Sequence, residues 1–150
     1  MSKQPEIGYV EDNTHILPLR VYYEDTDFSG LVYHAAYLKF LERGRTESFR
    51  FTGTSHLDLL AEKVPLAFAL RNMEISFIAP ARIDDVLQVH TRLLDAKGAR
   101  MSAEQSVFCE GVKLISAKVE MACIDLNGRP RRIPKFVMDK MLPVLFAEAT

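Results

Sequence analysis

The fold is decided by residues 22–51, which read YYEDTDFSGLVYHAAYLKFLERGRTESFRF. In the second half of this segment, apolar or small residues recur at helical spacing: Tyr37, Phe40, Leu41, Gly44, Ser48 and Phe51. The opposite face is charged, with Lys39, Glu42, Arg43 and Arg50. This pattern is typical of an amphipathic helix with one buried face. Gly44 costs roughly 1 kcal/mol of helix propensity relative to alanine, which indicates that a sheet packs against the helix backbone there.

Strand patterns lie on both sides of this helix. Before it, Leu19, Val21 and Tyr23 alternate with polar residues, which predicts a strand over residues 17–23. After a shorter helical stretch at 56–62, three more runs alternate: residues 73–79, 87–93 and 115–123. Turn pairs at Lys97-Gly98, Glu110-Gly111 and Asn127-Gly128 predict another strand between the first two turns and favour antiparallel neighbours in a meander. A last helix is expected over residues 135–142.

The order of these elements predicts the fold class. One apolar sheet face needs a cover, and the long helix is the only large cover available. We therefore expect an α+β fold in which an antiparallel five-stranded sheet wraps around one long central helix. A single domain over residues 1–150 is expected, with residues 1–13 frayed. The exposed strand edges favour self-association.

The composition excludes several classes of protein. Hydrophobic residues make up 48% and charged residues 26%, with a net charge of -1, as in an ordinary globular protein. The longest basic patch is residues 129–132, so no nucleic-acid partner is expected. The charged N-terminal residues predict neither a secretory signal nor a membrane span, and a cytoplasmic location is expected. Cys109 and Cys123 lie in apolar stretches, which favours buried thiols over a disulfide.

The chemistry is concentrated in the motif D-T-D-x-x-G-x-V-Y-H-x-x-Y, which occupies residues 25–37. This segment resembles the 4-hydroxybenzoyl-CoA thioesterase group of hotdog enzymes, and most closely their YbgC-type acyl-CoA thioesterases associated with the Tol-Pal system. The resemblance implies a hotdog fold, a catalytic carboxylate at Asp27, and His34 beside the thioester at the start of the helix. It implies a substrate-binding role for four further motif residues: Gly30, Val32, Tyr33 and Tyr37. Many relatives have a small residue after the catalytic Asp, where this chain has Phe28 and Ser29, a departure expected to bear on acyl-group preference without removing a catalytic group.

Thioester hydrolysis has requirements that these residues meet. A carboxylate must attack the carbonyl or activate a water, and Asp27 would be the nucleophile or the general base. Free backbone N-H groups at the helix start, between His34 and Tyr37, would stabilise the developing oxyanion. His34 would orient the water, donate to the substrate or protonate the leaving thiolate. Asp25 is expected to hold the loop by accepting backbone hydrogen bonds.

No metal or other cofactor is expected, because Asp25 and Asp27 have no third ligand at a suitable spacing. The resemblance implies acyl-CoA as substrate and a homo-oligomer, a dimer or a dimer of dimers (a homotetramer), with the acyl chain entering between subunits. An acyl carrier protein is a further candidate partner. Exposed cations are candidates for the CoA phosphates: Arg71, Arg92, Lys97 and Lys118.

Two alternatives remain open. A hotdog dehydratase or hydratase would need a His paired with an acidic residue, and the intact motif argues against it. A noncatalytic acyl- or acyl-carrier-protein-binding module of an inner-membrane-associated complex would dock through an apolar face of the last helix, at Phe136 and Met141.

Overall fold

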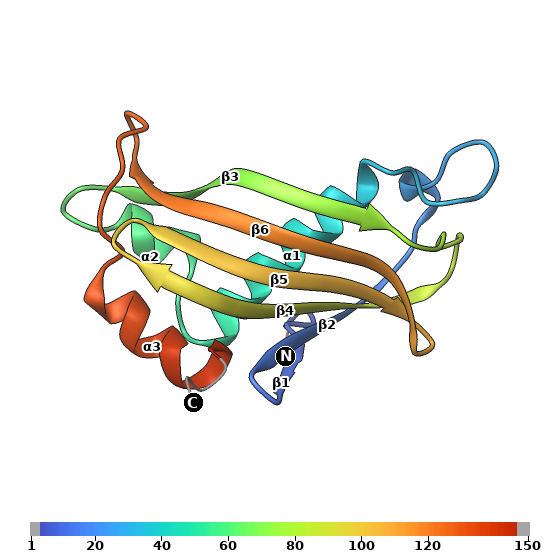
Figure 1. Ribbon diagram of the computed structural model, residues 1–150, viewed down its shortest axis with the longest axis horizontal. Coiled ribbons are helices and arrows are strands. Elements are labelled where there is room, and N and C mark those ends of the chain that lie inside the picture. The colour runs from blue at the N-terminus through green and yellow to red at the C-terminus, as the bar shows by residue number, and fades with distance from the viewer. Residues whose placement is uncertain (1–3, 147–150) are drawn as a thin grey trace.

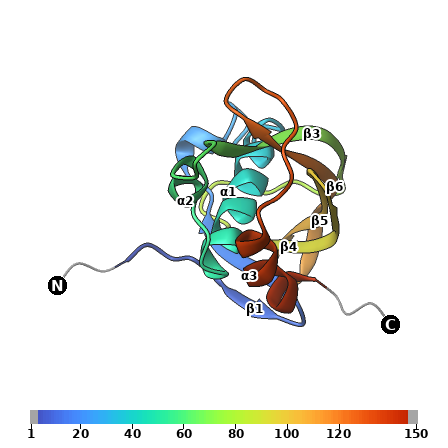
Figure 2. The same cartoon turned by 90° about the vertical axis from the view of Figure 1, so that its left-hand side faces the viewer.

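Helix α1 (Ala36–Phe51) lies inside the curve of one antiparallel sheet in the computed structural model, which describes residues 4–146. Figure 1 shows the long strands crossing the helix, and Figure 2 shows the sheet bending around it. Its buried face includes the predicted Tyr37, Phe40, Leu41 and Gly44, whereas Phe51 is exposed. The sheet wrapped around a central helix is therefore confirmed.

The sheet has six strands in the order β1-β2-β4-β5-β6-β3, and every pair of neighbours is antiparallel. The strands are β1 (Tyr9–Glu11), β2 (Thr14–Arg20), β3 (Leu66–Phe77), β4 (Val86–Lys97), β5 (Arg100–Cys109) and β6 (Val112–Asp125). The helical elements besides α1 are the 3-10 helix η1 (Tyr23–Asp25), α2 (His56–Leu60) and α3 (Lys135–Leu145).

Three details of the predicted sheet were wrong. The sheet has six strands rather than five, because Tyr9–Glu11, within the segment expected to fray, pairs with β2. The first predicted strand is displaced: β2 ends at Arg20, and Tyr23 lies in η1, where the Asp25 carboxylate accepts the Tyr22 N-H and turns the chain. The meander holds only for β4, β5 and β6. Strand β3 pairs with β6 at the far edge, because residues 78–85 carry the chain across the end of the sheet.

The close approach predicted at Gly44 is confirmed. A Cβ at this position would lie 2.6 Å from Val89 Cγ1 and 3.1 Å from Thr91 Oγ1, both on β4. Contacts between carbon atoms ordinarily lie at about 3.5–4.0 Å. Only glycine therefore lets the helix backbone pack this close to the central strands.

A buried polar cluster that helical spacing did not reveal lies beside Gly44. Arg45 is 8% exposed, and its Nη1 donates to Gln105 Oε1 at 2.9 Å. Gln105 Nε2 in turn donates to the Leu41 carbonyl and to Thr91 Oγ1, each at 2.9 Å. Burial lowers the pKa of Arg45. The cluster ties α1 to β4 and β5 through hydrogen bonds as well as apolar contacts.

Helix α3 packs against the end of the sheet opposite the Tyr23–His34 loop (Figure 1). Met141 is fully buried in the core, so it packs within the molecule and is not part of the docking face of the alternative noncatalytic module. Both cysteines are free, as predicted, although Cys109 is only partly buried.

Candidate active site

The loop between β2 and α1 is folded by the acidic motif. Asp25 is buried at 8% exposure, and its Oδ2 accepts the Tyr22 N-H at 2.8 Å. Its carbonyl accepts the Tyr33 N-H at 2.9 Å, which closes the loop on itself. Asp25 thus has the structural role predicted for it, because its carboxylate and its backbone are both committed to the loop.

Asp27 is exposed at the tip of this loop. Its Oδ1 accepts the Ser29 N-H at 2.8 Å and a short hydrogen bond from the Ser29 hydroxyl. These two bonds, the hydroxyl first, hold the pKa of the Asp27 carboxyl below its ordinary value. The carboxylate is therefore ionised at neutral pH, as a nucleophile or a general base must be.

The segment after Asp27, residues 30–32, is held in place by backbone hydrogen bonds. Gly30 has φ +81°, donates its N-H to the Asp27 carbonyl at 3.1 Å, and accepts the Ile83 N-H at 3.2 Å. Val32 donates to the Ala81 carbonyl at 2.9 Å. These bonds attach the loop to residues 81–83, which follow β3 in the chain but lie beside the start of α1.

Helix α1 begins directly after this segment with free donors. Within residues 4–146, the backbone N-H groups of His34, Ala35 and Tyr37 donate to no acceptor. The N-cap residue is Ala35, which has no side-chain oxygen to accept a hydrogen bond from these groups. Unpaired N-H groups at a helix N-terminus carry partial positive charge, which suits an oxyanion.

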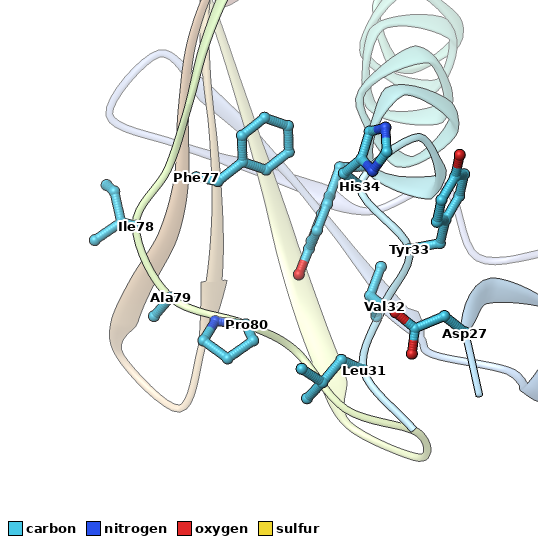
Figure 3. Close-up of a pocket in the computed structure, with 10 residues that line it drawn as sticks. Asp27, Leu31, Val32, Tyr33, His34, Phe77, Ile78, Ala79 and Pro80 are labelled. Carbon is cyan, nitrogen blue, oxygen red and sulfur yellow. The ribbon is translucent and has the colours of Figure 1, made fainter. Parts of the chain in front are cut away.

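A cleft of about 470 Å³ lies between the Asp27 loop, the start of α1 and the end of β3. Its lining comprises Asp27, Leu31, Val32, Tyr33, His34, Tyr37, Phe77, Ile78, Ala79 and Pro80. Figure 3 shows Asp27 facing residues 77–80 across this cleft, with His34 at the start of the helix. The ring of His34 lies 4.4 Å from that of Tyr33 and 6.4 Å, edge to face, from that of Phe77.

The structure brings most of the predicted site residues together. Asp27, His34, Val32, Tyr33 and Tyr37 all line the cleft. The predicted Gly30 lies instead in the turn behind it, where its backbone is hydrogen-bonded.

The opposite wall of the cleft, residues 77–80, was not found from sequence. No motif marks it, and only the fold carries the end of β3 to the start of α1. Tyr37 links the two sides, because its hydroxyl accepts the Ala81 N-H at 3.0 Å.

The cations suggested for the CoA phosphates lie on strands of the sheet. Arg71 is paired with Glu120 at 3.9 Å and Arg92 with Glu104 at 3.6 Å. Thr91 and Leu93 on β4 are buried toward α1, so Arg92 between them faces away from the helix. This outer face of the sheet is not the surface that lines the cleft.

In the described part of the chain, no group of three or more His, Cys, Asp or Glu side chains is arranged to hold a metal ion. Across residues 4–146, no helix is both long enough and apolar enough to cross a membrane.

The fold and this cleft define a hotdog thioesterase architecture, and comparison with known families agrees. The sequence signature of the Thioesterase-like superfamily matches residues 21–141, so the chain belongs to that superfamily. The resemblance inferred from the motif is confirmed.

Individual relatives within this superfamily are similar to the chain over most of its length. The chain is 42% identical over 123 residues to the acyl-CoA thioester hydrolase YbgC of Escherichia coli O6:H1, covering 81% of this chain and 90% of that protein. It is equally identical over 127 residues to the acyl-CoA thioesterase YbgC of Haemophilus influenzae, covering 84% of this chain and 93% of that one. The crystal structure of a probable thioesterase from Bartonella henselae is similar with a TM-score of 0.79 at 46% identity, covering 81% of this chain and 99% of that one.

Proposed function

We propose that this chain hydrolyses acyl-CoA thioesters to a free acid and CoA, with Asp27 as the catalytic carboxylate. The observation that carries the proposal is an ionised, exposed carboxylate that lines the same apolar cleft as the start of helix α1, where backbone N-H groups are free. The YbgC relatives, named as acyl-CoA thioester hydrolases or thioesterases, support the same substrate class.

Two routes satisfy the chemistry at Asp27. In the first, a carboxylate oxygen attacks the thioester carbon, the C–S bond breaks, and water then hydrolyses the acyl-aspartyl anhydride. In the second, the carboxylate takes a proton from a water that attacks the same carbon. In both, negative charge develops on the carbonyl oxygen; the C=O bond then reforms as the C–S bond breaks, and its electron pair leaves on sulfur as the CoA thiolate.

The start of α1 would stabilise that charge. Its unpaired N-H groups at positions 35 and 37 are fixed before substrate arrives, so they need no reorganisation during the reaction. Loss of one such donor typically costs about 100- to 1,000-fold in rate. His34, held between two aromatic rings at the cleft, would orient the water or protonate the departing thiolate.

The experiment that tests the proposal measures thiol release from short, long and aromatic acyl-CoA esters. We expect turnover by the native protein and none by Asp27→Ala, with an unchanged circular dichroism spectrum, because an exposed loop side chain contributes little to packing. A near-native kcat in Asp27→Asn would contradict the assignment of Asp27 as the catalytic carboxylate. Binding of acyl-CoA without turnover in the native protein would favour the noncatalytic acyl-binding module.

The two routes are separated by mass spectrometry of acid-quenched enzyme. An acyl adduct on Asp27 assigns the nucleophilic route. Its absence, together with a solvent deuterium isotope effect on kcat, assigns the general-base route.

A homo-oligomer formed through β3 is also proposed. Among the described residues this strand has a neighbour on only one side, and it carries exposed Leu70 and Phe77, of which Phe77 lines the cleft. Pairing with a second copy would cover this edge and place the cleft next to the interface. Light scattering of native protein and Leu70→Asp tests it: a charge on this exposed side chain opposes pairing of the β3 edge with a second copy, so the variant should have the smaller mass. Equal masses would contradict this edge as the interface.

Four expectations from the sequence stay predictions: assembly as a tetramer rather than a dimer, association with the Tol-Pal system, an acyl carrier protein as partner, and a cytoplasmic location.

A further inference from the structure

The two oxygens of the Asp27 carboxylate have different surroundings. Oδ1 accepts both donors of Ser29, the backbone N-H at 2.8 Å and the hydroxyl. The Leu31 N-H makes a smaller contribution to the lowered pKa of this carboxyl, but none of the side-chain hydrogen bonds found within residues 4–146 ends on Oδ2. One neighbouring residue therefore distinguishes two otherwise equivalent atoms.

We infer that Ser29 is a positioning residue that commits Oδ1 to the loop and leaves Oδ2 as the oxygen that acts on the thioester or the water. This inference rests on the proposed role of Asp27. Two hydrogen bonds to a charged oxygen fix the carboxylate plane and draw electron density from that oxygen. The reacting oxygen then meets the cleft in one orientation, which removes rotational freedom before the reaction starts.

The Ser29 hydroxyl has no evident role in holding the loop. Backbone bonds close the turn without it: Asp27 N-H to the Leu31 carbonyl at 2.9 Å, and Gly30 N-H to the Asp27 carbonyl at 3.1 Å. Ser29 itself is exposed, as is Phe28 before it. Removing the hydroxyl should therefore change the carboxylate and leave the backbone in place.

The charged and titratable neighbours of Asp27 matter to the test. Three of them, Tyr33, His34 and Tyr37, line the same cleft. Asp25 lies in the loop itself, two residues before Asp27, and Arg82 lies on the segment paired with Leu31. None of these side chains is hydrogen-bonded to Asp27. A change confined to the Ser29 hydroxyl thus acts on Asp27 and not on these groups.

The test compares Ser29→Ala and Ser29→Thr with native protein in pH profiles of thiol release from the best acyl-CoA ester of the panel. In Ser29→Ala we expect the acid limb of kcat/KM to move to higher pH, because the ionised carboxyl loses a donor. We also expect kcat to fall by about tenfold, in line with the loss of one hydrogen bond to a charged group. Ser29→Thr keeps a hydroxyl and should stay within about twofold of native protein.

Measurement of Asp27→Ala in the same assay distinguishes failure of the role inferred for Ser29 from failure of the proposed function. If Asp27→Ala is inactive while Ser29→Ala keeps the native kcat and acid limb, the inference about Ser29 is overturned and the function stands. An equal loss in Ser29→Thr and Ser29→Ala also overturns it, because the hydroxyl is then not the cause. Native activity in Asp27→Ala removes the proposed function, and the role of Ser29 with it.

Discussion

Replacement of Gly44 by alanine tests the packing of the central helix on the sheet. The new Cβ would lie 2.6 Å from Val89 Cγ1, roughly 1 Å inside an ordinary carbon contact. Val89 is fully buried on β4 between two other strands, and its β-branched side chain has few rotamers. The Cβ would also press on Thr91 and Gln105, which are hydrogen-bonded to each other.

The expected loss follows from two opposing effects. Overpacking a well-filled core costs about 1–3 kcal/mol, and the closeness of this contact puts it near the upper end. Alanine regains roughly 1 kcal/mol of helix propensity over glycine. The free energy of unfolding should therefore fall by about 2 kcal/mol, which lowers Tm by about 4–8 °C for a chain of this size.

Urea unfolding of native protein and Gly44→Ala measures this loss. Arg43→Ala, on the exposed face, is the matched control and should stay within about 0.5 kcal/mol. In a Val89→Ala background the obstructing methyl groups are gone, and Gly44→Ala should stabilise by up to about 1 kcal/mol. The same loss in both backgrounds would refute the contact with Val89, and a gain in native protein would refute the close packing altogether.

Two further changes probe other buried groups. Tyr37→Phe removes the acceptor of the buried Ala81 N-H, so urea unfolding should show a loss of about 1–3 kcal/mol; an unchanged midpoint would mean that the bond is not made. Burial lowers the pKa of His15 and of His90, so the unfolded chain takes up protons first as pH falls below about 6.5. The free energy of unfolding should then fall between pH 7 and 5, by at most about 1.4 kcal/mol per pH unit for each histidine. In His15→Gln this fall should be smaller, and an equal slope would exclude His15 as a cause.

Local patterns were sufficient to predict most elements of this fold. The spacing of Tyr37, Phe40 and Leu41 identified the central helix, and residue alternation with Gly-containing turns identified β4, β5 and β6. Strand β3 was misplaced in the sheet, because the choice of neighbour depends on which partner buries more surface and not on any local repeat. The loop at 78–85 is long enough to allow either order.

The active site likewise has features that the sequence predicted and features that depend on tertiary contacts. The sequence by itself determined the acidic loop and the helix that follows it, and so the placement of Asp27 and the start of that helix in one cleft, because these residues are close together in the chain. Only the tertiary structure decided the wall at 77–80, the burial of Arg45 and the position of the open β3 edge. Those features depend on contacts between segments far apart in sequence, which the packing of the whole sheet around α1 brings together.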